Sequence, residues 1–167
     1  MSEKETAQAP TQAEPAWRRA AMPQSERFQE KVDLPFQHNI LVHATQNINT
    51  GSCIWDAALV LGSYLSNSQL FPASFWHGKK VCEIGAGCGV TGIVAAQLGA
   101  DVVLTELEDE LVLLGRNVAD NPINASPFPS ESGNSHTGSA KSAEFFWGND
   151  PSHLEGPFDF VLAADCV

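Results

Sequence analysis

Hydrophobic side chains recur along the middle of the chain with the spacing of helices. One set is spaced at i, i+4, i+7 and i+11 and comprises Ile54, Ala58, Leu61 and Leu65. A second set covers 90–98 and is followed by Gly99, a residue type that is common just after the end of a helix. A third set, within 108–119, comprises Leu111, Leu114 and Val118. These spacings predict helices over 54–65, 90–98 and 108–119.

Short apolar runs alternate with these helices. They cover 79–84, 101–105, 143–147 and 158–164, and a strand pair at 32–36 and 38–43 precedes them. Alternating strands and helices are typical of an α/β fold with a parallel sheet. The run FDFVLAA at 158–164 is apolar on both faces, which predicts a central place in that sheet.

Two segments lack hydrophobic periodicity. Residues 1–29 are polar and contain Pro10, Pro15 and Pro23, which predicts a disordered leader. Residues 122–142 include PFPSESGNSHTGSA, and this composition predicts a flexible surface insertion. The predicted domain therefore covers 30–167, with a flexible insertion at 122–142.

The composition indicates one soluble globular domain, since 43% of the 167 residues are hydrophobic and 17% are charged. The 20 acidic residues outnumber the 9 basic ones, so the formal net charge is -11. Neutralisation of phosphates dominates nucleic-acid affinity, and this charge therefore disfavours a nucleic-acid partner. It favours a protein substrate, in particular a basic segment.

The cysteines and histidines do not indicate a metal site. Cys53, Cys82, Cys88 and Cys166 form no CxxC pair, and the five histidines have no metal-ligand spacing to them. We expect reduced thiols and no bound metal. No run approaches the roughly 18 apolar residues that a membrane span requires, and the N-terminus lacks the apolar core of a signal peptide. We expect a monomer in the cytoplasm or nucleus, without a membrane partner.

The segment KVCEIGAGCGVTG (80–92) joins the first strand of the sheet to its helix through a glycine-rich turn. Glycine lets a backbone approach a ligand closely, and a helix N-terminus offers amides and a partial positive charge. Gly87, Gly89 and Gly92 match the dinucleotide pattern GxGxxG by spacing. That fingerprint places its first glycine directly after the strand, however, whereas here Gly85 comes first and gives GxGxG. The turn alone predicts only a nucleotide-type ligand.

Two carboxylates help to identify the ligand. Glu83 stands at the end of the first strand, where it would repel a pyrophosphate and attract an ammonium or sulfonium. S-adenosylmethionine carries both positive groups, and its carboxylate would face the amides of the turn. Glu106, at the end of the second strand, can accept hydrogen bonds from both ribose hydroxyls. The alternative for Glu106 is an acid that stabilises the N-terminus of the next helix.

Five ordered motifs carry a resemblance to a known family. They are GSCIWDAALVLGSYL, GKKVCEIGAGCGVTGIVAAQLGADVVLTE, LLGRNVADN, FFWGND and FDFVLAADCV, spread over 51–167. In these motifs the chain resembles the seven-β-strand lysine methyltransferases of the family 16 (methyltransferase-like 21) type. The resemblance implies a Rossmann-like class I methyltransferase sheet, S-adenosyl-L-methionine as cofactor and methylation of a lysine side chain in a protein.

The resemblance also implies roles for single residues. The group that would bind the methionine moiety comprises Glu83, Gly85, Gly87 and Gly89. Glu106 would hold the ribose, Trp55 would lie over the cofactor and Trp147 would flank the adenine. Ala164 would close the pocket near the methyl donor. For both tryptophans, packing in the core is the alternative.

Asp165 is the candidate catalytic residue. It ends the fourth strand and matches the acid of the family's D-x-x-Y pattern, which implies that it holds a lysine ammonium and aims the nitrogen at the methyl group. Cys166 has no basic neighbour in the sequence and is not expected to be a nucleophile. Asn117 and Asn121 match paired asparagines of the family, for which we expect a capping or turn role.

The family's sheet has the strand order 3-2-1-4-5-7-6, and this sequence supplies strands 1 to 4. The aromatic of the acid motif is also absent after Val167. We therefore interpret the chain as truncated after strand 4, with strands 5 to 7 missing, and expect it not to fold stably alone. Three hypotheses stay open: a protein-lysine methyltransferase, a non-catalytic truncated product that binds a partner, and an NAD-type dinucleotide-binding half of an oxidoreductase.

Overall fold

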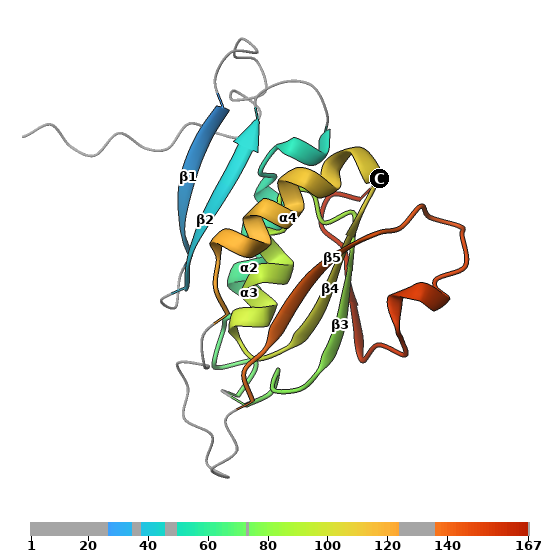
Figure 1. Ribbon diagram of the computed structural model, residues 1–167. Coiled ribbons are helices and arrows are strands. Elements are labelled where there is room, and N and C mark those ends of the chain that lie inside the picture. Colours follow the sequence, from blue (N-terminus) through green and yellow to red (C-terminus); the bar gives the residue numbers. More distant parts are fainter. Residues whose placement is uncertain (1–26, 35–37, 46–49, 73, 124–135, 167) are drawn as a thin grey trace, which may run out of the picture.

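The protein is built in three layers. The computed structural model describes residues 27–34, 38–45, 50–72, 74–123 and 136–166. Figure 1 shows an antiparallel strand pair, β1 (Arg27–Leu34) and β2 (His38–Thr45), then a layer of helices, then a four-stranded sheet. The strand pair forms as predicted but is longer, and β1 begins inside the range assigned to the leader. Residues 1–26 of that leader lie outside the described residues.

The sheet is parallel throughout and has the order β5-β4-β3-β6. Its strands are β3 (Lys80–Ile84), β4 (Asp101–Glu106), β5 (Ser139–Glu144) and β6 (Phe160–Leu162). In the order in which these strands follow along the chain, this is 3-2-1-4. The prediction of an α/β, Rossmann-like sheet is therefore confirmed for strands 1 to 4.

Strand β6 is shorter and less enclosed than predicted. It spans three residues and pairs only with β3 among the described strands, so the prediction of a central place is wrong for this sheet. Val161 in β6 is 62% exposed. Apolar side chains on both faces show that a strand can be covered on both sides, but they do not show which strands lie beside it.

Strand β5 begins in the last part of the predicted insertion and shares only residues 143–144 with the strand predicted at 143–147. It reads SAKSAE and pairs with β4 from Ser139 opposite Asp101 to Glu144 opposite Glu106. A strand at the edge of the described sheet needs only one covered face, and Ala140 packs on the core from that face. The apolar run was misleading because it follows the strand. Residues 124–135 of the insertion lie outside the described residues.

The helices form close to the predicted positions and lie on one side of the sheet (Figure 1). They are α2 (Asp56–Leu65), α3 (Val90–Gln97) and α4 (Leu111–Asp120), with the single-turn 3-10 helices η1 (Thr50–Ser52) before α2 and η2 (Glu108–Glu110) before α4. The ends differ from the prediction by at most three residues, as helix ends often do. None of the helices that the structure describes has the length and apolar character to cross a membrane.

Helix α3 is buried on all sides because it lies between β2 and the sheet. Every residue from Val90 to Ala96 is buried. Small residues make this possible: a Cβ on Gly92 would lie 2.6 Å from the Cδ2 atom of Leu104. The close approach of helix and sheet therefore requires a glycine at this position.

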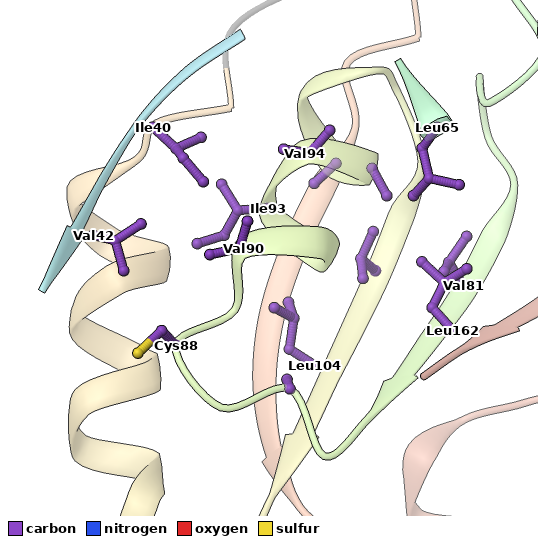
Figure 2. Packing of buried hydrophobic residues seen from close by; sticks show 14 of the residues in the cluster. Ile40, Val42, Leu65, Val81, Cys88, Val90, Ile93, Val94, Leu104 and Leu162 are labelled. Atoms are coloured by element: carbon purple, nitrogen blue, oxygen red, sulfur yellow. The ribbon is translucent and has the colours of Figure 1, made fainter. Parts of the chain in front are cut away.

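Figure 2 shows how the hydrophobic core joins the three layers. Ile40 and Val42 point from β2 toward Val90 and Ile93 of α3, and Leu104 meets α3 from the sheet side. All five side chains are at most 2% exposed. Full burial of such a side chain stabilises a fold by about 1.5 to 3 kcal/mol. The strand pair β1–β2 is therefore part of the domain and not an appendage.

The other face of the sheet carries a smaller cluster. The segment after β5 crosses this face and includes the 3-10 helix η3 (Ser152–Leu154). Leu154 is 2% exposed and packs against Cys82 of β3 and Val103 of β4. This segment also carries Trp147, so its packing helps to place that side chain at the carboxyl end of the sheet.

Candidate cofactor site at the carboxyl ends of the strands

A cleft of about 620 Å³ lies at the carboxyl ends of β3, β4, β5 and β6. Parallel sheets bind ligands at this edge, because the segments that follow the strands converge there. Eight of the nine predicted site residues line the cleft, namely Trp55, Glu83, Gly85, Gly87, Glu106, Trp147, Ala164 and Asp165. The fold thus brings together residues from five separate segments of the chain.

The glycine-rich turn between β3 and α3 has the conformation that only glycine adopts readily. Gly85, Gly87 and Gly89 have φ angles of 59, 54 and 81°. The turn is also tight, since a Cβ on Gly85 would lie 2.8 Å from the sulfur of Cys166 and one on Gly87 would lie 3.2 Å from the carbonyl oxygen of Gly51. Side chains at these positions would move the turn or its neighbours.

Gly89 is the one predicted site residue that does not line the cleft. It is the N-cap residue of α3, and a Cβ there would lie 2.7 Å from Cδ1 of Leu114 and 3.1 Å from Cδ2 of Leu104. Glycine is required here for the positive φ and for packing of the turn against α4. The sequence could not separate this requirement from ligand contact, because both favour glycine.

Glu83 is a buried carboxyl group at the end of β3. Its side chain is 2% exposed, and its Oε2 atom accepts a hydrogen bond of 2.8 Å from the amide of Gly92. Burial raises the pKa of Glu83 to about 8, the negative charge of Glu106 adds to this rise, and hydrogen bonds from Gly92 and Thr91 oppose it. An ionised Glu83 would therefore be stabilised by a cation that enters the cleft.

Glu106 ends β4 and contacts the glycine-rich turn. Its Oε1 atom accepts a hydrogen bond of 3.1 Å from the amide of Gly87, and its Oε2 atom accepts one of 2.7 Å from the amide of Leu107. Each oxygen keeps a further lone pair for a ligand hydroxyl. The alternative, an acid that only stabilises the next helix, does not account for the bond to Gly87.

Protein partners already hold several amides of the turn. Ala86 donates to the carbonyl of Thr105 at 3.0 Å, Gly89 donates to the carbonyl of Ala86 at 2.8 Å, and Gly87 donates to Glu106 as above. These bonds shape the turn before a ligand arrives. The three amides are consequently not the ones that a ligand carboxylate would use.

The two predicted tryptophans lie at the mouth of the cleft. Trp55 is 38% exposed and Trp147 is 49% exposed, so the alternative of core packing is wrong for both. Phe146, which the sequence analysis missed, is 61% exposed and also lines the cleft. Its neighbour Trp147 was the signal that could have found it. Exposed aromatic faces at one cleft favour a flat ligand.

Ala164, Asp165 and Cys166 follow β6 and line the cleft. Asp165 is exposed and has a φ angle of 56°, a conformation in which Asp and Asn are the most tolerated residues after glycine. The thiol of Cys166 donates to the carbonyl of Ile84 at 3.0 Å, and burial raises its pKa. Cys166 thus fastens this segment to the end of β3, in agreement with the expectation that it is not a nucleophile.

The side chains of the acid and base type that line the cleft are all acids. Glu83, Glu106 and Asp165 line it, and no lysine, arginine or histidine does among the described residues. The described part of the chain also holds no group of three or more histidine, cysteine, aspartate or glutamate residues arranged for a metal ion. The cleft is therefore suited to a ligand that carries positive charge.

Comparison with known proteins agrees with this site. Residues 36–167 match the family model described as lysine methyltransferase. The chain belongs to this lysine methyltransferase family. The match includes the glycine-rich turn, both glutamates and Asp165, so the dinucleotide-binding alternative is not favoured.

Several members of the lysine methyltransferase family are similar over much of this chain. EEF1A lysine methyltransferase 3 of Xenopus tropicalis is 34% identical over 128 residues, which are 77% of this chain and 50% of the relative. Protein N-lysine methyltransferase METTL21A of Mus musculus is 36% identical over 124 residues, or 73% of this chain and 50% of the relative. The chain spans about half the length of these relatives.

Among solved structures, the 16S rRNA N2 G1207 methyltransferase RsmC of T. thermophilus, in complex with AdoMet and guanosine, matches with a TM-score of 0.49 and 20% identity. The match covers 66% of this chain and 30% of the other.

The structure confirms the capping role expected for Asn121 and corrects the role expected for Asn117. Asn121 is the C-cap residue of α4, and its Nδ2 atom donates to the carbonyl of Asn117 at 2.7 Å, whereas the side chain of Asn117 neither caps a helix nor forms a turn. Both side chains bind backbone groups of β2.

Proposed function

We propose that this chain binds S-adenosylmethionine in the cleft and takes part in transfer of the methyl group to a lysine side chain of a protein. The observation that carries the proposal is the acidic lining of the cleft: three carboxyl groups line it beside a glycine-rich turn, without a basic residue among the described ones. Glu83 has no cationic partner among the residues that line the cleft with it. The ammonium and sulfonium of the cofactor would supply the missing positive charge.

Five of the predicted cofactor residues have a part that their position supports. Glu83 would hold the ammonium and Glu106 the ribose hydroxyls, since both carboxylates border the cleft on either side of the turn. The exposed rings of Trp147 and Trp55 would cover the flat and apolar parts of the cofactor. Ala164 would leave space near its reacting methyl group. S-adenosylmethionine supplies the chemistry, an activated methyl group on a sulfonium.

Asp165 would bind the acceptor lysine. It is exposed at the cleft, so a lysine ammonium could reach it from solvent and form a charge-assisted hydrogen bond. The carboxylate would orient the amine, and the ammonium would lose its proton to water before the nitrogen attacks. Catalysis would come mainly from positioning. Because the chain carries a net charge of -11, we propose a basic segment as the substrate region.

Isothermal titration of the chain with S-adenosylhomocysteine tests the cofactor site, with NAD as the control ligand. We expect S-adenosylhomocysteine to bind and NAD not to bind, because a pyrophosphate would lie among acidic side chains. Glu106→Gln should weaken binding by about tenfold through loss of ribose hydrogen bonds. Glu108→Gln removes an equal charge outside the cleft and should leave binding unchanged. Binding of NAD alone, or equal effects of the two variants, would contradict the proposal.

A further inference from the structure

Asn117, on α4, joins three segments that are far apart in the sequence. Its side chain is fully buried. The Oδ1 atom accepts a hydrogen bond of 2.8 Å from the amide of His43, and Nδ2 donates to the carbonyl of His43 at 3.0 Å. Nδ2 also donates to the carbonyl of Cys88 at 2.9 Å. One side-chain amide group thus binds both strand β2 and the glycine-rich turn.

Asn121 makes a similar set of bonds one helical turn later. Its Oδ1 atom accepts from the amide of Leu41 at 2.8 Å, and Nδ2 donates to the carbonyl of Leu41 at 2.7 Å. The third bond, of 2.7 Å, goes to the carbonyl of Asn117 within α4. The two asparagines therefore pair with β2 in the way a neighbouring strand would, but only Asn117 contacts the turn.

The turn needs such an anchor because of its glycines. Cys88 lies between Gly87 and Gly89, both with positive φ. Glycine adopts many backbone conformations, so a turn built from it is ordered only by contacts from outside. The bond from Asn117 is made to the peptide between Cys88 and Gly89, just before α3 begins.

We propose that Asn117 is a positioning residue for cofactor binding, which holds the glycine-rich turn in its binding conformation by tying the carbonyl of Cys88 to β2. The inference rests on the proposed function of the cleft. It also assigns a role to the strand pair β1–β2: this pair fixes the place of the turn from the far side of the helix layer, although the pair does not itself line the cleft.

The matched variants are Asn117→Ala and Asn121→Ala. Each removes a buried amide with three hydrogen bonds, of which two go to β2. We expect similar drops in the midpoint of thermal unfolding. Affinity for S-adenosylhomocysteine, measured by titration well below both midpoints, should fall by about tenfold or more in Asn117→Ala and by less than about threefold in Asn121→Ala.

Equal losses of affinity in the two variants would overturn the inference and leave the proposed function intact. Failure of the unmodified chain to bind S-adenosylhomocysteine would instead contradict the proposed function. If Asn117→Ala does not fold, Asn117→Ser and Asn121→Ser, which remove less volume, serve for the same comparison.

Amide hydrogen exchange in the unmodified chain tests the link without a cofactor or a variant. The amides of Ala86, Gly87 and Gly89 are hydrogen-bonded and report on opening of the turn. If Asn117 ties the turn to β2, these amides and those of His43 and Leu41 should share one opening free energy and one denaturant dependence. A turn that opens at lower free energy than β2 would overturn the inference.

Discussion

A single buried residue, Glu83, shows most clearly how this site depends on its surroundings. A carboxyl group at the end of an apolar strand is unfavourable when ionised, because burial removes the water that would stabilise its charge. The structure places one backbone amide, that of Gly92, within hydrogen-bonding distance, and no basic side chain of the described residues lines the cleft. The pKa of Glu83 is accordingly raised to about 8.

This raised pKa predicts a pH dependence of stability. Glu83 ionises near its ordinary value of 4.5 in the unfolded chain and near 8 in the folded one, so folding binds a proton between these values. The contribution of Glu83 to the free energy of unfolding is fully present below about pH 4.5 and is lost as the pH rises to about 8. Glu83→Gln lacks this loss, and its unfolding free energy relative to the unmodified chain should therefore rise from pH 5 to pH 8.

Urea unfolding at pH 5, 6, 7 and 8 measures this difference. Glu108→Gln is the control for loss of a charge at an exposed position, and its profile should run parallel to that of the unmodified chain. A parallel profile for Glu83→Gln as well would show that Glu83 is ionised in the folded protein.

At the scale of elements, the strand pair β1–β2 belongs to the cooperative core. Ile40 is 1% exposed and packs against α3, so Ile40→Ala should lower the free energy of unfolding by about 2 to 5 kcal/mol. Val60 on α2 is 69% exposed, and Val60→Ala should change the free energy of unfolding by less than about 0.5 kcal/mol. Chemical denaturation followed by tryptophan fluorescence measures both. A small effect of Ile40→Ala would show that the strand pair unfolds separately.

Secondary structure was predictable where burial imposes a period on the sequence. Helix α2 and strands β3 and β4 are covered by apolar neighbours, and their positions follow from the spacing of apolar residues. The start of strand β5 was predicted four residues too late, because the strand lies at the edge of the described sheet and needs few apolar residues. Its place depends on backbone pairing with β4, which leaves little trace in side-chain polarity.

At the scale of the whole molecule, the net charge of the chain and the acidic side chains in the cleft have the same sign. The net charge is -11, and the acids Glu83, Glu106 and Asp165 meet at the same cleft. A negative field would attract a basic protein segment, and Asp165 at the cleft would bind its lysine.

Methyl transfer from labelled S-adenosylmethionine to a protein substrate tests this arrangement. We expect Asp165→Asn to lower the rate by about tenfold or more, because a charge-assisted bond to the lysine is lost, while affinity for S-adenosylhomocysteine stays unchanged. Asparagine tolerates the φ angle of 56° at this position, so the backbone should be preserved. Equal activity of Asp165→Asn and the unmodified chain would exclude Asp165 from lysine binding.

The sequence by itself determined the class of fold, the glycine-rich turn and the pair Glu83 and Glu106, because local spacing and residue chemistry report directly on strand ends and turns. Only the tertiary structure decided which glycines face the cleft. It also decided that Trp55 and Trp147 are exposed and that Asn117 connects β2 to the glycine-rich turn. These facts depend on contacts between residues that are distant along the chain. Such contacts arise because buried polar groups need hydrogen-bond partners and apolar faces need to be covered. The local sequence does not show which distant residues will meet these needs.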